Sequence, residues 1–152
     1  MKMNKRKGFT LVELIVVIVI LGILMGIGAL KYADVKRGAN LRTLQTNHKN
    51  ILSALQLQQA NNAGTIDTTK YKDLDAIIAK TADGLVSGIT QGVPAGAVYA
   101  WDAPTNVLTT SVAQTDAEKH YPKMKTAGAI SITDNLITGE HTLVPDDEDY
   151  WK

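Results

Sequence analysis

The sequence predicts an α+β protein in which one long N-terminal α-helix packs on a small C-terminal antiparallel β-sheet. The first observation is an apolar run near the N-terminus that passes into a stripe of apolar residues with helical spacing, ending near residue 60. The second is a set of short apolar segments after residue 96, separated by turn-forming residues. Helical sequence followed by several short strands is the pattern of an α+β fold.

The apolar run covers residues 9–30 and carries one charged residue, Glu13. A helix rises about 1.5 Å per residue, so a run of this length spans a hydrocarbon core of about 30 Å. Cationic residues on one side of a short span hold that end in the cytoplasm. The segment ahead of the run has four basic residues and no acidic one: Lys2, Lys5, Arg6 and Lys7. We therefore expect a single-pass membrane precursor with its N-terminus in the cytoplasm and its C-terminus outside.

Glu13 places a carboxylate close to one end of the predicted span. Such a residue indicates either a functional site with a partner or a side chain that reaches the headgroup boundary. If the chain is cut after Gly8, the new ammonium group of Phe9 lies four residues ahead of Glu13. That ammonium could neutralise a carboxylate on a neighbouring subunit. Position alone leaves both interpretations open.

The row KRKGFTLVELIVVIVILGIL resembles the class III signal of type IV pilins and type II secretion pseudopilins. That signal is a short basic leader, a Gly, a Phe, three residues, a Glu and an apolar helix. The resemblance covers roughly residues 1–32. It implies that a prepilin peptidase cleaves between Gly8 and Phe9 and methylates the Phe9 amine. It also implies that Glu13 pairs with Phe9 of an adjacent subunit, and that the fold is pilin-like.

Two other kinds of N-terminal segment share this hydropathy. A secretory signal has an apolar core of about 7–15 residues and a small-x-small cleavage site after it. Here the run is longer and is followed by ALKYADVKR, which has no clear site of that kind. An uncleaved signal anchor fits the hydropathy equally well, and only Gly8, Phe9 and Glu13 distinguish the pilin interpretation from it.

Gly22 and Gly26 form a G-x-x-x-G pair within the span, and Gly28 follows. Small residues at this spacing let another helix approach closely. Glycines also weaken a helix, by about 1 kcal/mol each relative to Ala in water. Either property suits a subunit that leaves the bilayer and packs into a fibre, but Gly is also common in membrane helices. The Pro that the resembling family often has near this point is absent from this chain.

The helical pattern continues beyond the span to about residue 60, with a single apolar stripe. The stripe contains Leu41, Leu44, His48, Ile51, Leu52 and Leu55. We interpret His48 as a residue at the boundary of the stripe and not as a ligand, because no second His or carboxylate accompanies it at i+4. Gly64 suits the left-handed position that ends such a helix.

The remaining chain predicts a small head domain. Thr68 or Thr69 can cap a short helix over residues 71–80. Strands are expected over 97–101, 106–112, 129–133 and 140–144, with a turn over 133–139. The predicted organisation is a cleaved leader (1–8), a membrane and assembly helix segment (9–30), the amphipathic half of the same helix (31–60) and a head domain with an acidic tail (61–152).

Composition excludes several classes of function. The chain has no Cys, so disulfides, thiol catalysis and thiolate metal sites are excluded. Of the 16 basic residues four lie in the leader, so the mature chain has 12 against 15 acidic residues and a net charge of −3. This balance argues against nucleic-acid binding through a basic patch. No nucleophile, phosphate-binding or zinc motif is present, so we expect a protein that is not an enzyme and has no catalytic residues.

The acidic stretch Asp146–Asp149 allows two interpretations. Clustered carboxylates can bind Ca²⁺, which takes about six to eight oxygen ligands, and resemblance to the major pseudopilins implies a calcium site in this region. However, the spacing D-x-[DN]-x-[DN]-G is absent, as is that family's Gly-rich loop. We therefore expect a solvated tail with no cofactor, and keep calcium as the alternative.

These observations together predict the structural subunit of a type IV pilus. The expected partners are prepilin peptidase, an assembly platform in the membrane and further copies of the chain in a helical filament on the cell surface. A major pseudopilin of a type II secretion system, stabilised by calcium, is one alternative. A membrane-anchored binding module on an uncleaved anchor, which would keep Lys2 to Lys7, is another.

Overall fold

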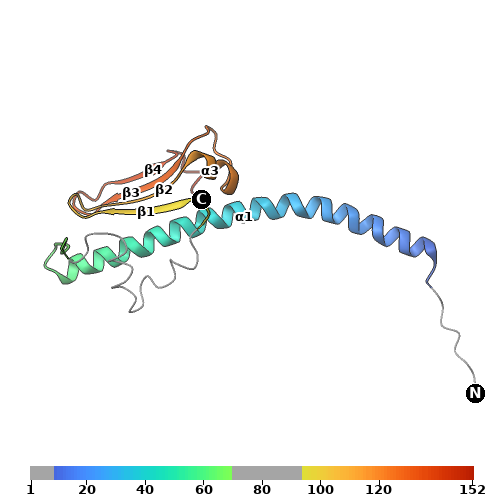
Figure 1. Cartoon of the computed structure of the whole chain (residues 1–152), viewed down its shortest axis with the longest axis horizontal. Coiled ribbons are helices and arrows are strands. Elements are labelled where there is room, and N and C mark those ends of the chain that lie inside the picture. Colours follow the sequence, from blue (N-terminus) through green and yellow to red (C-terminus); the bar gives the residue numbers. More distant parts are fainter. Residues whose placement is uncertain (1–8, 70–93) are drawn as a thin grey trace, which may run out of the picture. The chain divides into compact units, whose positions relative to one another are not determined.

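The computed structural model describes residues 9–69 and 94–152, so Gly8, the leader and the helix expected over 71–80 lie outside the described residues. Two compact units are distinguished, Met1–Val35 and Lys36–Lys152. The elements are α1 (Leu11–Asn61), β1 (Ala97–Asp102), β2 (Val107–Val112), α3 (Gln114–His120), β3 (Ile130–Asn135) and β4 (His141–Val144) (Figure 1). A long N-terminal helix followed by a small antiparallel sheet confirms the predicted α+β fold.

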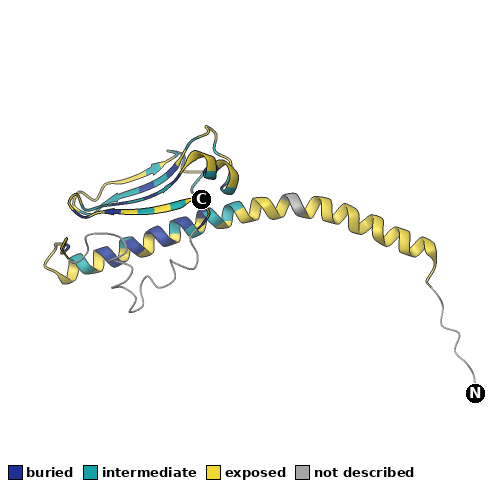
Figure 2. Ribbon diagram, in the orientation of Figure 1, coloured by how far each residue is buried: buried dark blue, intermediate teal, exposed yellow. Residues whose placement is uncertain are grey.

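Helix α1 runs through both units and changes character between them. By length and composition it is able to cross a membrane. Its described residues in the first unit are exposed, whereas buried residues follow in the second (Figure 2). The helix ends at Asn61, and the N–H of Gly64 donates to Gln59 O at 2.9 Å. Gly64 has a φ of +84°, which confirms the predicted left-handed position at the helix end.

The sheet is an antiparallel meander in the order β1-β2-β3-β4. All four expected strands are present, and none of their ends differs from the prediction by more than two residues. The start of the expected turn over 133–139 is wrong, because β3 continues to Asn135. Asp134 and Asn135 pair with Leu108 and Val107 of β2, and this ladder overrides their turn preference.

The core of the second unit lies between the stripe of α1 and the inner face of the sheet. Burial alternates along β2 and the first half of β3, as expected for strands with one covered face. One cluster joins Ile51, Ala54 and Leu55 to residues that include Trp101 and Leu108. A second joins Leu41 and Leu44 to Val112, Tyr121 and Ile130, among others. Full burial of one such aliphatic side chain contributes about 1.5–3 kcal/mol, so the predicted stripe is what holds the sheet to α1.

Helix α3 was not predicted from the sequence. Its seven residues, QTDAEKH, include one apolar residue, Ala117, which is fully buried. No side chain caps its first turn, so local signals for a helix are weak. Asn40 of α1 donates from Nδ2 to His120 O at 2.8 Å, which ties the end of α3 to α1. The position of α3 therefore depends on tertiary contacts.

Candidate functional site

The predicted assembly residues lie where α1 begins. Phe9 precedes the first helical residue and is 83% exposed. Glu13 Oε2 accepts hydrogen bonds from the backbone N–H of Thr10 at 2.9 Å and from the Thr10 hydroxyl at 3.0 Å. In return, the Glu13 N–H donates to Thr10 Oγ1 at 3.3 Å. This reciprocal arrangement is a capping box, which sequence reasoning missed although Thr-x-x-Glu before an apolar run is its signal.

The capping box fixes where the Glu13 carboxylate points. A carboxylate in the first turn is also favoured by the positive end of the helix dipole. Both bonds from Thr10 go to Oε2, and no described residue donates to Oε1. Thr10 of the same chain therefore holds the carboxylate through Oε2. The second oxygen, Oε1, can still accept a hydrogen bond from a further donor or pair with a cation.

The remainder of the first unit presents an apolar surface that no other part of the described chain covers. From Leu11 to Ile27, its large apolar side chains are between 46% and 74% exposed. A Cβ added at Gly22, Gly26 or Gly28 would meet nothing within 4 Å. Packing among the described residues therefore does not require glycine at these three positions.

His48 is not a boundary residue, and that interpretation is corrected here. Its side chain is 2% exposed, with Nδ1 lying 2.8 Å from Thr110 Oγ1 and Nε2 lying 2.6 Å from Asp134 Oδ2. The second oxygen of Asp134 lies 2.9 Å from His141 Nδ1. A search at i+4 along the helix missed these partners because they come from strands 62 and 86 residues away in the chain.

This cluster has the hydroxyl–imidazole–carboxylate order of a nucleophilic site, but the burial of Thr110 opposes that chemistry. Thr110 is 0% exposed, so a substrate carbonyl has no access to its oxygen. Burial lowers the pKa of His48 more than hydrogen bonding and charge attraction by Asp134 raise it. The neutral ring donates through Nε2–H to Asp134 and accepts at Nδ1 from Thr110. The cluster thus joins α1 to the sheet.

The C-terminal segment agrees only in part with the expected solvated tail, because Asp146, Glu148 and Asp149 are exposed but the aromatic residues after them are not free in solvent. Tyr150 and Trp151 are half-buried and pack against the core cluster around Leu44. Trp151 Nε1 donates to Pro145 O at 2.8 Å, and Gln45 Nε2 of α1 donates to Trp151 O at 2.9 Å. The two aromatic rings meet edge to face, with centroids 5.4 Å apart. Apolar burial therefore fastens the acidic segment to the head domain.

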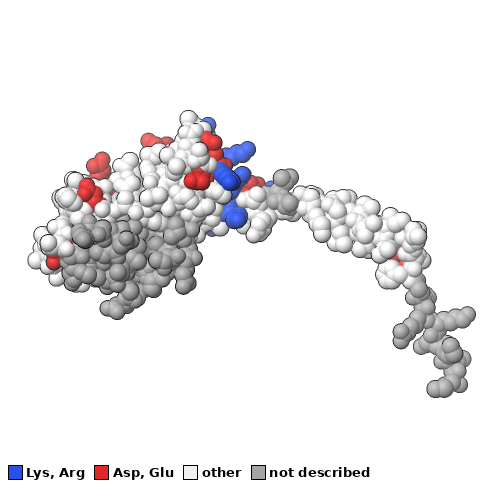
Figure 3. All heavy atoms as spheres, in the orientation of Figure 1, with Lys and Arg blue, Asp and Glu red and all other residues white. Residues whose placement is uncertain are grey.

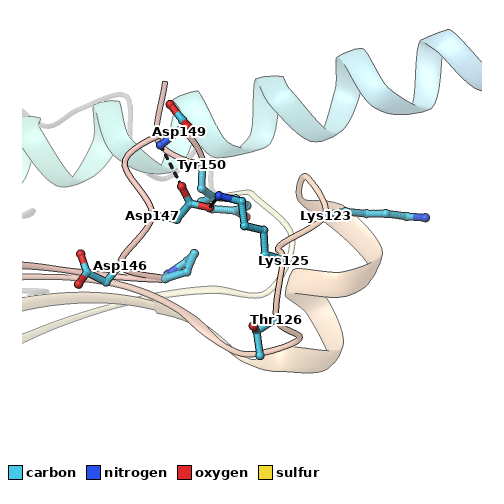
Figure 4. A pocket seen from close by; sticks show the side chains of 8 residues that line it. Lys123, Lys125, Thr126, Asp146, Asp147, Asp149 and Tyr150 are labelled. Atoms are coloured by element: carbon cyan, nitrogen blue, oxygen red, sulfur yellow. Dashed lines mark hydrogen bonds and ion pairs between the residues drawn. The ribbon is translucent and has the colours of Figure 1, made fainter.

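A cleft of about 560 Å³ lies beside this segment. Lys125 reaches across it to Asp147, whereas Lys123 points away (Figure 4). Lys125 Nζ lies 2.8 Å from Asp147 Oδ2, and the N–H of Asp149 donates to Asp147 Oδ1 at 3.2 Å. The hydrogen bond from Lys125 is the largest cause of the lowered pKa of Asp147. Lys125 thus forms an ion pair with the Asp147 carboxylate, which would be a ligand of a calcium ion bound to this segment.

Charge is distributed unevenly over the surface. Lys and Arg side chains gather around α3 (Figure 3). Leu14 to Leu30, by contrast, contain no charged residue. Among the described residues, no group of three or more His, Cys, Asp or Glu side chains is arranged to hold a metal ion. Two features therefore distinguish the described surface: an apolar helix segment that no described residue covers, and a head with charges of both signs. The described residues contain no metal centre.

Comparison with known proteins agrees with these features. Residues 3–29 match the family model described as the prokaryotic N-terminal methylation motif. The chain is 33% identical over 87 residues to the type IV narrow pilus major component PilA5 of Thermus thermophilus, an alignment that covers 57% of this chain and 69% of the relative. No solved structure gives a significant match. The motif, the long helix followed by a small sheet and the extent of the match to this relative show that the chain belongs to the type IV pilin family.

Proposed function

We propose that this pilin-type structural subunit forms the filament of a type IV pilus. The observation that carries the proposal is the apolar surface of α1 from Leu11 to Ile27, which no other described residues cover and which has the capped carboxylate of Glu13 near its start. A helix that is apolar all round is buried either in lipid or among other helices. The same segment serves both purposes in turn, first as the membrane anchor of the precursor and then as the packed centre of the fibre.

Processing prepares the segment for the second role. Prepilin peptidase cleaves between Gly8 and Phe9, and the new amine of Phe9 is methylated. Phe9 lies outside the helix and is largely exposed, so its amine is accessible. The cationic leader, which favours the cytoplasm, is removed by the same cleavage.

Glu13 then sets the register between subunits. The capping box orients its carboxylate and leaves Oε1 without a partner among the described residues. The ammonium of Phe9 from a neighbouring subunit pairs with this oxygen as the helices pack. A buried carboxylate without a partner is strongly unfavourable, so the pair selects one axial position. Because the contact joins two different surfaces and does not close, it generates an open filament.

The first test is the intact mass and the N-terminal peptide of the protein extracted from its native membrane or fibre. We expect a chain that begins at Phe9 with one additional methyl group on its amine. A chain that still carries Lys2 to Gly8 would have no Phe9 ammonium. That result would replace the filament proposal with the membrane-anchored binding module.

A further inference from the structure

The largely apolar contact between α1 and the sheet includes a buried polar group of side chains around His48. It consists of His48 from α1, Thr110 from β2, Asp134 from β3 and His141 from β4, which we call the His48 latch. Both ring nitrogens of His48 are used, and each oxygen of Asp134 takes a different imidazole. The buried ring of His48 therefore joins the helix to β2 and β3, and Asp134 extends the connection to His141 of β4.

We propose that the His48 latch fastens the sheet to α1 at neutral pH and releases it in acid. The proposal concerns the second unit of the single chain, Lys36–Lys152, so it holds or fails independently of filament formation.

The hydrogen-bond pattern explains why a proton disrupts the latch. With Nε2–H donating to Asp134, an added proton goes to Nδ1, which faces Thr110 Oγ1. The hydroxyl of Thr110 must then accept the bond that it formerly donated. Thr110 is 0% exposed, and its oxygen has no other hydrogen-bond partner among the described residues. Protonation thus leaves a buried hydroxyl proton without an acceptor, which is unfavourable.

The surrounding charges do not compensate fully for this loss. Asp134 on β3 favours the charged ring, whereas His141 on β4 opposes it when it carries a charge itself. Lys49 of α1 lines the same groove, of about 210 Å³, and adds a further positive charge. From β2 the latch receives only the hydroxyl of Thr110. Burial outweighs the attraction of Asp134, so the pKa of His48 lies below its usual range.

The direction of the pH effect follows from this shift. A histidine in the unfolded chain has a pKa of about 6.5, so below this pH the unfolded state binds a proton that the folded state resists. The stabilising contribution of neutral His48 is complete above about pH 6.5 and is lost as the pH falls toward its lowered folded value. In that interval the unfolding equilibrium constant rises by up to about tenfold per pH unit because of this one group.

The experiment measures chemical unfolding of the full chain in detergent micelles at a series of pH values from 7.5 to 5, with near-UV circular dichroism as the signal. We expect the wild-type chain to lose stability more steeply than His48→Gln, whose side chain does not titrate. His120→Gln is the matched control, because His120 lies on α3 and contacts Asn40 through its backbone oxygen. This control should keep the wild-type slope. Equal slopes for wild type and His48→Gln would overturn the proposal.

A second measurement decides the question if His48→Gln fails to fold. Nitrogen NMR of the wild-type chain labelled at histidine reports the protonation state of each ring. The expected result is a neutral His48 ring with its proton on Nε2 down to the pH at which the head domain begins to unfold. A His48 ring that is already charged at pH 7 in the folded chain would show that the latch is an ordinary ion pair, and the proposal would be abandoned.

Discussion

Thr10 and Glu13 cap α1 reciprocally, with the Thr10 N–H and hydroxyl both bound to Glu13 Oε2 at 2.9 and 3.0 Å. The Glu13 carboxylate therefore has a local partner at Oε2, and no described residue donates a hydrogen bond to its Oε1. The structural role of Glu13 and its proposed role in assembly can be separated, because the first needs only a hydrogen-bond acceptor and the second needs a negative charge.

We predict that Glu13→Gln leaves leader cleavage intact but strongly reduces the yield of fibres. The amide oxygen of Gln is still able to accept the bonds from Thr10, whereas its neutral group cannot balance the Phe9 ammonium of a neighbour. Thr10→Val is the complementary variant, since it removes the hydroxyl of the capping box and keeps the charge. Sheared fibres counted by electron microscopy provide the measurement. Normal fibre yield from Glu13→Gln would show that the charge is not needed.

The glycines of the span give a second prediction. A Cβ at Gly22 or Gly26 meets no atom of the described residues within 4 Å, so the double replacement by Ala should leave the single subunit intact in the membrane. If the pair provides a close helix contact in the fibre, the two added methyl groups reduce fibre yield or shift the spacing of subunits. Gly38→Ala is the matched control, because Gly38 also lies on α1 in open space but outside the span. Unchanged fibres from the double variant would assign these glycines no packing role.

Comparison of Gly96 with Gly139 distinguishes two reasons for glycine, a left-handed backbone and a close contact with a neighbouring side chain. Both have left-handed backbones, with φ of +74° and +73°. A Cβ at Gly139 meets nothing within 4 Å, whereas one at Gly96 collides with the side chain of Asp116 on α3. We expect Gly139→Ala to lower the free energy of unfolding by about 1–2 kcal/mol, from backbone strain alone. Gly96→Ala should lower it further because α3 must also move. Equal losses in denaturant unfolding would contradict the contact with Asp116.

Calcium provides a test of the C-terminal segment. Because Lys125 is paired with Asp147 at 2.8 Å, we expect that a chelator leaves the melting temperature of the full chain in detergent unchanged. Replacement of Lys125 by Met removes the competing cation and serves as the comparison, since any latent affinity of these carboxylates for calcium should then increase. A melting temperature of the wild-type chain that falls on chelation would restore the calcium-stabilised pseudopilin alternative.

Local sequence signals determine most of the secondary structure of this protein and its N-terminal motif. The apolar period of α1, the left-handed Gly64 and the four short strands are each encoded within a few residues, so they could be predicted one at a time. The motif around Gly8, Phe9 and Glu13 is local too, and it indicates a pilin-type protein without knowledge of any tertiary contact. The Thr10–Glu13 capping box was equally local and was missed only because Glu13 was considered as a charge and not as a cap.

Only the tertiary structure decided the roles of His48, Asp134 and Trp151. His48 and Asp134 are 86 residues apart, and they become neighbours only when β3 pairs in the sheet that packs on α1. Trp151 packs because the core offers an apolar site beside Leu44, while the four acidic residues before it indicate exposure to solvent. Periodicity specifies which face of an element is apolar, but it carries no information about which distant polar group that face meets. Partners of that kind are selected by the packing of the whole head domain.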